Sequence, residues 1–376
     1  MDKRFLVVAG SAGSFIGFRK PLLLALKEKG LDVHVVAPNL LANAKVMTAL
    51  KEVGIVAHEV PMQRTGMNPL RDLQSLFALF GLMKKIKPDY VLGYTIKPVI
   101  YGSIAARLAG VPQRFALITG LGYAFISADG RGLVRTIAQS LYRFAIKGVH
   151  VIFFQNPDDR DFFQQQAITA PNSNQVVVNG SGVDIDEYPA TPLPDGEPRF
   201  LLIARLLGDK GVREYVAAAK LVKEKHPNIQ FDLVGDLDAN PNSISKQELE
   251  GWVEKGLVNY LGYLDDVRTA IKQSSVFVLP SYREGTPRSV LEAMSMARAI
   301  ITTDAPGCRE TVQEGLNGFL VPIKNSEVLA ERMLKLIQDP ELLRQMGTAS
   351  REIAVEKYDV RKVNAQMLQA MQISAT

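Results

Sequence analysis

The 376-residue chain has one cysteine and four histidines, and both scarcities restrict its chemistry. Cys308 alone excludes a disulfide framework and a cysteine metal cluster, and its isolation fits a reducing compartment. The histidines are scattered, without the HxH or HExxH spacing of a zinc site; they are His34, His58, His150 and His226. The sequence therefore predicts neither disulfides nor a bound metal.

Long hydrophobic runs are also missing. No run approaches the roughly 18 apolar residues of a transmembrane helix, and MDKRFLVVAGSAG has too short an apolar core for a signal peptide. Aromatic residues make up 7% of the chain and are dispersed, whereas a nucleic-acid surface would cluster them with cations. We expect a cytoplasmic protein without a nucleic-acid partner.

Charge is unevenly distributed along the chain. Residues 1–188 hold 21 Lys and Arg against 14 Asp and Glu, a net +7, and the remainder holds 23 against 25, a net −2. Together these give the overall net charge of +5. A basic half indicates an anionic partner, such as a phosphorylated substrate or the inner face of a membrane.

The chain alternates short apolar runs with segments of helical periodicity, on both sides of a proline-rich stretch (PATPLPDGEP, residues 189–198). Such alternation predicts βαβ units and parallel sheets, and the proline-rich stretch predicts an interdomain linker. We therefore expect an α/β protein with two Rossmann-like domains facing across a cleft. The predicted domains are 1–188 and 199–358, with a last helical segment predicted at 359–376.

Two glutamates eight residues apart, Glu284 and Glu292, are the most informative feature (PSYREGTPRSVLEAMSM, 280–296). A buried strand is predicted at 276–280 and a helix from near Pro287, a residue favoured at the first helical position. This arrangement places Glu284 on the loop and Glu292 about one turn into the helix. Beside the free N–H groups of a helix start, two carboxylates can accept hydrogen bonds from the hydroxyls of a sugar nucleotide. Two solvated surface charges are the alternative interpretation.

Further motifs follow predicted strands of the same half. Arg205 and Lys210 lie in ARLLGDKG after the strand at 200–204, and such a pair can neutralise a diphosphate, unless both are solvated loop cations. Tyr263 and Leu264 follow the strand edge at 258–262, where a flat base could meet backbone groups. Asp236 and Asp238 resemble a metal-binding DxD motif, although a loop turn is the favoured interpretation.

ARLLGDKG, the YLG edge, PSYREGTPRSVLEAMSM and DAPGCRETVQEGLNGFLVP, in this order, resemble the donor-binding domain of glycosyltransferase family 4. The resemblance implies the two-domain GT-B fold and retaining transfer. It implies that residues 1–188 bind the acceptor, that residues 199–358 bind the donor, and that the helix at 359–376 returns to the first domain. The first half is similar to a bacterial branch that extends undecaprenyl-diphosphate-linked sugars, including N-acetylgalactosaminyltransferases. Its marks are RTGMNPLRDL (64–73), YTIKPVIYGSIAARLAGVP (94–112), RFALITGLGYAF (114–125) and NGSGVDIDEY (179–188).

The family's roles transfer to matching positions as implications of the resemblance. Arg205 and Lys210 would hold the donor diphosphate, and Glu292 the ribose hydroxyls of UDP. Glu284 would bind hydroxyls of the transferred sugar. The backbone of Gly285 and Thr286 would approach the sugar or β-phosphate. Gly13 and Ser14, in a glycine-rich loop without the GxGxxG spacing, would line the diphosphate from the other domain, although a plain tight turn remains the alternative there.

The resemblance implies two substrates, a UDP-sugar whose sugar is an N-acetylhexosamine, with N-acetylgalactosamine favoured, and a lipid-linked saccharide acceptor; no cofactor or metal is expected. One departure from the family is that many members carry a histidine where this chain has Tyr94–Pro98, and Lys97 could serve an anionic acceptor there.

Two stretches, 73–87 and 131–147 with Arg131 and Arg135, could contact the inner face of the cytoplasmic membrane. The family resemblance favours the membrane interpretation, although core helices with cationic outer faces would explain these stretches nearly as well. The alternative functions are a UDP-sugar 2-epimerase and a non-catalytic sugar-nucleotide-binding scaffold.

Overall fold

The computed structural model describes residues 3–63, 68–121, 132–238, 240 and 242–374, and for residues 132–134 the backbone only. The chain forms two compact units, which are described separately. Unit 1 comprises residues 1–181 and 361–376, and unit 2 comprises residues 182–360.

Unit 1 is built on a parallel sheet with seven strands among the described residues, in the order β3-β2-β1-β4-β5-β6-β7. Its strands are β1 (Arg4–Val8), β2 (Asp32–Ala37), β3 (Val56–Glu59), β4 (Tyr90–Tyr94), β5 (Gln113–Ile118), β6 (Val151–Phe154) and β7 (Gln175–Val177). Its helices are α1 (Ser14–Gly17), α2 (Lys20–Glu28), α3 (Ala44–Glu52), α4 (Pro69–Ile86), α5 (Ile96–Ala109), α7 (Gly132–Ile146), α8 (Pro157–Gln165) and α15 (Val360–Ala370), which begins at the boundary.

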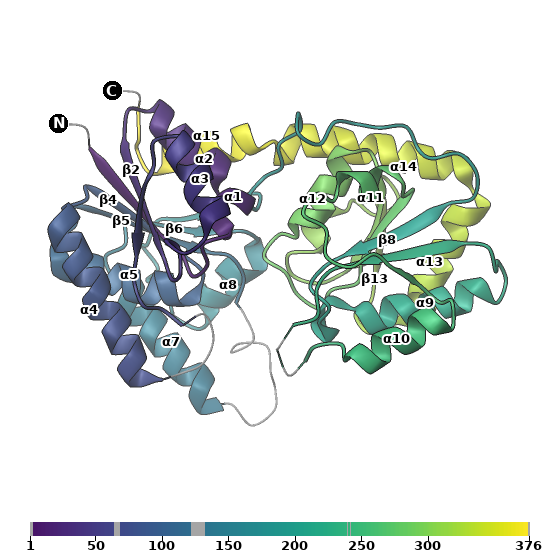
Figure 1. Cartoon of the computed structure of the whole chain (residues 1–376), viewed down its shortest axis with the longest axis horizontal. Helices are drawn as coiled ribbons and strands as arrows, with labels where there is room; N and C mark the ends of the chain where they lie inside the picture. Colours follow the sequence, from purple (N-terminus) through teal and green to yellow (C-terminus); the bar gives the residue numbers. More distant parts are fainter. Residues whose placement is uncertain (1–2, 64–67, 122–131, 239, 241, 375–376) are drawn as a thin grey trace. The chain divides into compact units, whose positions relative to one another are not determined.

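Helices cover both faces of this sheet, which explains why its central strands are apolar on both sides. One face packs against α2, α3 and α15 through residues such as Phe5, Leu23 and Met367. The other packs against α4, α5 and α7 through residues such as Leu79 and Ile104 (Figure 1). Because the strands are parallel, the loops that follow them all emerge at one edge of the sheet, its carboxyl edge.

Unit 2 repeats this plan with a parallel sheet whose described strands run β10-β9-β8-β11-β12-β13. The strands are β8 (Arg199–Ile203), β9 (Gln230–Val234), β10 (Asn259–Tyr260), β11 (Val276–Leu279), β12 (Ala299–Thr303) and β13 (Gly318–Val321). The helices are η1 (Gly208–Lys210), α9 (Val212–Lys223), α10 (Lys246–Glu254), α11 (Arg268–Lys272), α12 (Arg288–Ser295), η2 (Arg309–Thr311), α13 (Ser326–Gln338), α14 (Pro340–Ile353) and η3 (Ala354–Tyr358). Two parallel-sheet units confirm the predicted α/β class.

The boundary between the units differs from the sequence-based one. The predicted linker, residues 189–198, lies inside unit 2, and residues 182–188 belong to that unit as well. The buried Arg298 holds the proline-rich stretch by donating to Thr191 O at 2.9 Å, to Thr191 Oγ1 at 2.6 Å and to Pro192 O at 3.1 Å. A proline-rich composition predicts an irregular backbone, but the docking of that backbone depends on one distant arginine.

The edge strand β3 was not predicted, because its residues alternate poorly and are at most half-buried. It contributes His58, whose Nε2 shares a 2.8 Å hydrogen bond with Nδ1 of His34 on β2. His34 Nε2 in turn lies 3.0 Å from the Asp32 carboxylate. Burial, then the neighbouring His34 and Lys85, lower the pKa of His58 below its ordinary value of 6.5.

This pKa shift predicts that unit 1 loses stability under mildly acidic conditions. A histidine with a depressed pKa binds fewer protons when folded, so its stabilising contribution is present above about pH 6.5 and falls as the pH drops below that value. Urea unfolding between pH 7.5 and 5.5 measures the effect, and we expect His58→Gln to flatten this pH dependence. The matched variant His226→Gln, in unit 2, should retain the wild-type profile; an unchanged slope in His58→Gln would contradict the assignment.

Among the described residues, no helix combines the length and the hydrophobicity that crossing a bilayer requires.

Candidate functional site

The predicted donor-site residues of unit 2 follow β8 and β11, two neighbouring strands. From β8 the sheet order runs to β9 on one side and to β11 on the other, which makes this position the topological switch point of the sheet. In open α/β sheets, ligands bind outside the carboxyl ends of the strands at such a point. Hydrogen bonds join the two loops, since Ser281 Oγ and the Tyr282 N–H donate to Asp209 O at 3.1 and 2.9 Å.

Two glycines allow these loops to approach closely. Gly211, with a φ of +72°, precedes α9, and a Cβ there would lie 2.1 Å from Pro280 O. Gly307, with a φ of +80°, follows β12, and a Cβ there would lie 2.2 Å from Glu284 O. Only glycine fits both the backbone conformation and the contact at these positions. The loops after β8, β11 and β12 are thus packed into one framework around Glu284.

Lys210 and Glu284 form a direct ion pair across this framework. Lys210 Nζ lies 2.5 Å from Glu284 Oε1, and the two side chains are 18% and 15% exposed. Lys210 comes from η1 and Glu284 from the loop between β11 and α12. The structure therefore brings together one member of the predicted cationic pair and one member of the predicted acidic pair.

Arg205 follows β8 and remains half-exposed. Its Nη1 donates to Asp238 Oδ2 at 2.9 Å, which uses one of the five donors of the guanidinium group. Asp238 also accepts the Asn240 N–H on Oδ1 at 3.0 Å, the arrangement of an Asx turn. This geometry agrees with the turn interpretation of the DxD-like motif.

Glu292 is buried, with 7% of its surface exposed. It lies on α12, whose N-cap is Pro287, one residue earlier than the predicted first helical position. Burial raises the pKa of Glu292, while the Arg288 guanidinium, 2.7 Å away, and the Tyr188 hydroxyl partly offset that rise. Ser289 Oγ donates to Ile203 O at 3.0 Å, so the first turn of α12 is fixed to the end of β8. Glu292 is thereby positioned at the same edge as Arg205.

Two further residues at this site, Tyr188 and Arg288, were not predicted from the sequence. Tyr188 O accepts hydrogen bonds from Ser295 Oγ at 2.6 Å and from Arg351 Nη1 at 3.1 Å, which hold the segment before the proline-rich stretch against α12. The Arg288–Glu292 pair has an i,i+4 spacing and could have been found from it. The contact between Tyr188 and Glu292 joins residues 104 positions apart, so no local sequence pattern predicts it.

The remaining predicted donor-site residues lie in loops at the same edge of unit 2. Gly285 and Thr286 connect β11 to α12, and a Cβ at Gly307 would lie 2.6 Å from Gly285 O. Tyr263 and Leu264 follow β10; Tyr263 is exposed, and the preceding Gly262 accepts the Gly235 N–H at 2.9 Å. Their predicted contacts with a nucleotide stay predictions.

In unit 1, Gly13 is the N-cap of α1 and Ser14 is the first residue of that helix, directly after the loop that follows β1. The Ser14 hydroxyl lies 2.5 Å from Ser11 O and 2.6 Å from the Tyr94 hydroxyl, so it links the start of α1 to the end of β4. Lys97, at the start of α5, pairs with Asp72 of α4 at 2.7 Å. A diphosphate contact of Gly13 and Ser14 and an acceptor contact of Lys97 both stay predictions.

In the ranges that the structure describes, no group of three or more His, Cys, Asp or Glu side chains is arranged to hold a metal ion. The charged groups at the carboxyl edge of unit 2 include the Lys210–Glu284 pair, and Arg205 and Glu292 lie at the same edge. Fixed cations can stabilise a diphosphate leaving group, and fixed carboxylates can accept hydrogen bonds from ribose or pyranose hydroxyls. The site thus has the groups that a sugar nucleotide requires.

Comparisons with known proteins identify the family to which the chain belongs. Residues 183–353 match the family model described as Glycosyl transferases group 1, and residues 8–156 match Glycosyl transferase 4-like. Over 94% of both chains, the sequence is 30% identical to N,N'-diacetylbacillosaminyl-diphospho-undecaprenol alpha-1,3-N-acetylgalactosaminyltransferase from Campylobacter jejuni. The chain belongs to glycosyltransferase family 4. It is therefore an enzyme, a hexosyltransferase, as the motifs predicted.

Other relatives of this glycosyltransferase extend the comparison. It is 27% identical to UDP-Gal:alpha-D-GlcNAc-diphosphoundecaprenol alpha-1,3-galactosyltransferase from Escherichia coli, over 91% of this chain and 92% of that one. Sucrose-phosphate synthase from Thermosynechococcus elongatus has a similar fold, with a TM-score of 0.81, 18% identity and 98% of both chains covered. Anabaena HepE, solved with UDP, superimposes with a TM-score of 0.76 at 19% identity, over 98% of this chain and 99% of that one. These structures identify the fold as GT-B.

Proposed function

We propose that this glycosyltransferase moves an N-acetylhexosamine from a UDP-sugar to an undecaprenyl-diphosphate-linked saccharide. The favoured sugar is N-acetylgalactosamine. The product would be a precursor of a bacterial surface glycan or glycoprotein. The Lys210–Glu284 ion pair at the switch point of unit 2 carries the proposal, because it sets a cation beside a carboxylate where a sugar diphosphate needs both. The names of the Campylobacter and Escherichia relatives support the class of acceptor.

In the proposed reaction, the bond between the anomeric carbon and the diphosphate breaks, and the acceptor hydroxyl oxygen bonds to that carbon from the same face. The anomeric configuration is thereby retained. The departing UDP takes the proton of the acceptor hydroxyl, so no side-chain base is needed. Lys210 and Arg205 stabilise the charge that builds on the diphosphate, and fixed charges of this kind supply a large part of such catalysis. No metal is required, because these two cations take its place.

The donor would be held by contacts at the edge of unit 2. Glu292 would accept the ribose hydroxyls, with its carboxylate oriented by Arg288 and Tyr188. Glu284 would bind hydroxyls of the transferred sugar, with the backbone of Gly285 and Thr286 beside the sugar or the β-phosphate. The predicted base contacts of Tyr263 and Leu264 complete the proposed donor site.

A transfer assay tests the proposal. Radiolabelled UDP-N-acetylgalactosamine and UDP-N-acetylglucosamine are incubated with the enzyme, with and without an extract of polyprenyl-diphosphate-linked sugars. Label in the lipid phase is the expected result, and NMR of the product should show a retained α-linkage. Free UDP without labelled lipid would instead indicate hydrolysis or epimerisation, and neither product would leave a sugar-nucleotide-binding protein.

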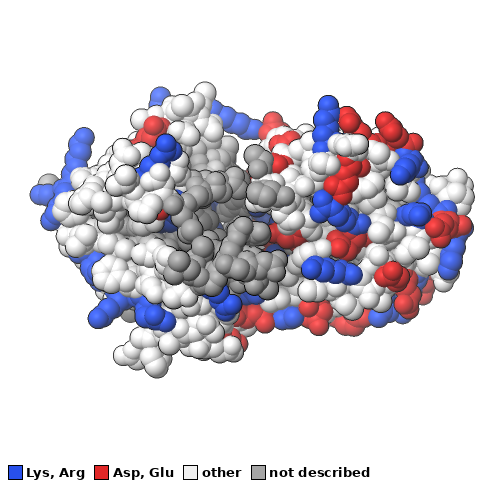
Figure 2. Space-filling model, turned by 90° about the horizontal axis from the view of Figure 1, so that it is seen from below, with Lys and Arg blue, Asp and Glu red and all other residues white. Residues whose placement is uncertain are grey.

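We further propose that unit 1 contacts the inner face of the membrane through α4. Leu70, Leu73 and Phe77 lie on one side of this helix and are 80%, 47% and 63% exposed. Lys84 and Lys85 follow in its last turn. The face in Figure 2 has few carboxylates over unit 1, while both signs are mixed over unit 2. Exposed apolar side chains beside cations are suited to an anionic lipid surface.

The second predicted membrane segment contributes less to this proposal. Arg131 lies outside the described residues. The Arg135 guanidinium lies 5.5 Å from the centre of the Phe162 ring of α8, and Arg143 donates to Ala167 O at 2.7 Å and to Gln166 O at 3.0 Å. On α7, Phe144 remains exposed. These contacts turn part of the cationic side of α7 toward its neighbour.

We expect Phe77→Asp to weaken binding to vesicles that contain anionic phospholipid by about tenfold. A carboxylate would replace an exposed aromatic ring that is expected to enter the lipid interface, where burial of a Phe side chain contributes about 1.5–3 kcal/mol. Co-sedimentation with phosphatidylglycerol vesicles measures the change. Val253→Asp is the matched control, since Val253 is an exposed apolar residue of unit 2. Equal binding by both variants would exclude α4 as the contact.

A further inference from the structure

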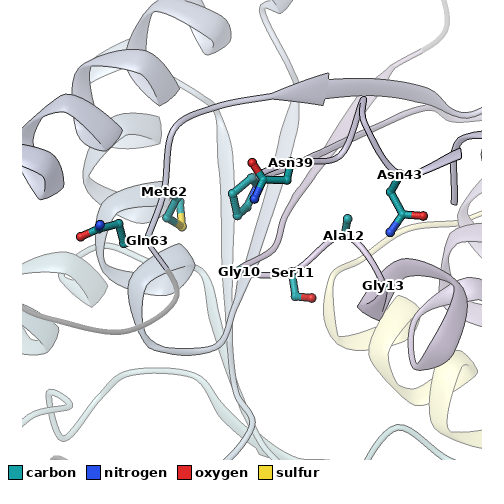
Figure 3. A pocket seen from close by; sticks show the side chains of 9 residues that line it. Gly10, Ser11, Ala12, Gly13, Asn39, Asn43, Met62 and Gln63 are labelled. Carbon is teal, nitrogen blue, oxygen red and sulfur yellow. The ribbon is translucent and has the colours of Figure 1, made fainter. Parts of the chain in front are cut away.

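The described residues of unit 1 include a pocket of about 540 Å³. Its walls are the loops that follow β1, β2 and β3, with Ser11, Asn39 and Gln63 among the lining residues (Figure 3). These loops belong to the part of the chain to which the family resemblance assigns the acceptor, so the pocket is part of that expectation. Unit 2 contains a side chain that neither the resemblance nor the proposed reaction uses, that of Tyr282.

Tyr282 lies two residues before Glu284, on the loop between β11 and α12, and is partly exposed. Its hydroxyl donates to Glu214 Oε1 at 2.6 Å, and Glu214 lies in the first turn of α9. Lys210 ends η1, and only Gly211 separates it from α9. The hydrogen bond between Tyr282 and Glu214 therefore joins the two segments that carry the Lys210–Glu284 ion pair.

Two further contacts hold Tyr282 in place. Its N–H donates to Asp209 O at 2.9 Å, so both the backbone and the side chain of this residue bind the segment that runs from η1 into α9. Lys324, which follows β13, has its Nζ 5.2 Å from the centre of the tyrosine ring, a distance at which a cation is attracted to the ring face. Tyr282 thus connects segments that follow three strands of the sheet, β8, β11 and β13.

The Glu214 carboxylate depends on the tyrosine hydroxyl. Its second oxygen, Oε2, is buried and has no hydrogen-bond partner among the described residues. Burial, then the hydrogen bond and the charge of Glu214, raise the pKa of Tyr282 above its ordinary value of 10, so the hydroxyl keeps its proton and stays the donor. Because a buried carboxylate that loses its donor is destabilised, the bonded arrangement of Tyr282 and Glu214 is strongly favoured.

We propose that Tyr282 is a positioning residue, which through Glu214 holds the Glu284 loop and the Lys210 segment at the separation that sugar transfer requires. The inference rests on the proposed function, which assigns the diphosphate to Lys210 and the sugar hydroxyls to Glu284. A lysine has a flexible four-carbon stem, so the ion pair alone does not fix the distance between the two segments. A tyrosine ring with only two side-chain torsions, bonded at its hydroxyl, is a more rigid connection.

The first test is Tyr282→Phe, which removes the hydroxyl and keeps the ring. We expect kcat for sugar transfer to fall about tenfold, and the KM for the UDP-sugar to change less than about threefold, because small displacements of catalytic groups slow the reaction itself. The ribose and base contacts proposed for Glu292, Tyr263 and Leu264 lie elsewhere, on α12 and after β10, and should persist. Initial rates over a range of UDP-sugar concentrations measure both parameters.

Further variants separate positioning from a general loss of stability. Tyr215→Phe, on the same helix as Glu214, removes a buried hydroxyl that donates to Asp232 O at 3.0 Å; it should lower the melting temperature and leave kcat unchanged. Glu214→Ala and the double variant Tyr282→Phe/Glu214→Ala should both lose about as much kcat as Tyr282→Phe, because all three break one hydrogen bond. Glu214→Gln keeps a carbonyl acceptor and should restore most of the activity that Glu214→Ala loses.

NMR of the Lys210 ammonium group gives a readout that does not depend on turnover. In full-length protein with isotope-labelled lysine, the protons of an ammonium group in a mostly buried ion pair exchange slowly enough to give a signal, and Lys210→Met assigns it. We expect this signal at the same position in the wild type and in Tyr215→Phe, and at a different position in Tyr282→Phe.

The outcomes distinguish this inference from the proposed function. An enzyme that labels lipid, but whose kcat is unchanged in Tyr282→Phe or falls equally in Tyr215→Phe, would overturn the positioning role and leave the proposed function standing. A wild-type protein that labels no lipid would overturn the proposed function. The Lys210 signal would then decide alone whether Tyr282 positions the ion pair, and an unshifted signal in Tyr282→Phe would overturn that role.

Discussion

Replacing Lys210 by alanine is expected to lower the rate of sugar transfer by about 100- to 1,000-fold, the usual result of removing one fixed group that stabilises transition-state charge. The Lys210 ammonium lies 2.5 Å from Glu284 and at the edge of unit 2 where the donor diphosphate is proposed to leave. Glu284→Gln should cause a loss of similar size, because the sugar hydroxyls would lose a charged acceptor. Initial rates with saturating UDP-sugar measure both effects.

Removing one member of this mostly buried ion pair is also expected to lower stability, so the structural and catalytic effects must be separated. Either single replacement removes the ion-pair contact of the charge that remains, at a cost of about 1–3 kcal/mol. We expect the double variant Lys210→Met/Glu284→Gln to regain part of that stability and none of the activity. Lys220→Ala and Glu254→Gln, exposed residues of the same unit, are the matched controls. Recovery of activity in the double variant would mean that the pair has only a structural role.

Glu292→Gln is expected to weaken UDP binding by about 10- to 100-fold. The buried carboxylate would lose its charge, and the proposed bonds to the ribose hydroxyls would no longer be hydrogen bonds to a charged group, each of which contributes about 1.5–3 kcal/mol. Isothermal titration of the enzyme with UDP measures the change. The effect should appear in binding rather than only in turnover, because the ribose is remote from the bond that breaks.

Two further variants near Glu292 test whether the loss of UDP affinity comes from a specific contact. Tyr188→Phe removes one hydroxyl that orients the Glu292 carboxylate, and we expect a smaller loss of UDP affinity, about threefold to tenfold. Glu187→Gln is the matched control, since Glu187 is an exposed carboxylate adjacent in sequence to Tyr188. If Glu187→Gln and Glu292→Gln weakened binding equally, general electrostatics would explain the effect better than a ribose contact.

The strand, loop and helix around Glu284 could be predicted because their signals are local. The apolar run at Val276–Leu279 is a buried strand, and Pro287 marks the start of α12 within one residue. Lys210 was predicted from its position after a strand, and the structure adds its pairing with Glu284. Parallel strands bring such loops to one edge of the sheet, so sequence order alone indicated that these residues would meet.

Other features depend on contacts that no local pattern contains. The proline-rich stretch was assigned as a linker, but the buried Arg298, more than 100 residues away, binds its carbonyl groups. Strand β3 was missed because an edge strand with half-buried residues lacks the hydrophobic pattern of the central strands. The pocket in unit 1 draws its walls from three separate loops, each unremarkable alone. Tertiary packing, rather than composition, determines these features.

The most direct test of the account is a crystal structure of the enzyme with UDP-N-acetylgalactosamine. We predict that the nucleotide lies at the carboxyl edge of unit 2, with the ribose hydroxyls on Glu292, the diphosphate on Lys210 and Arg205, and the sugar beside Glu284. A nucleotide bound elsewhere, without contact to these four side chains, would contradict the account.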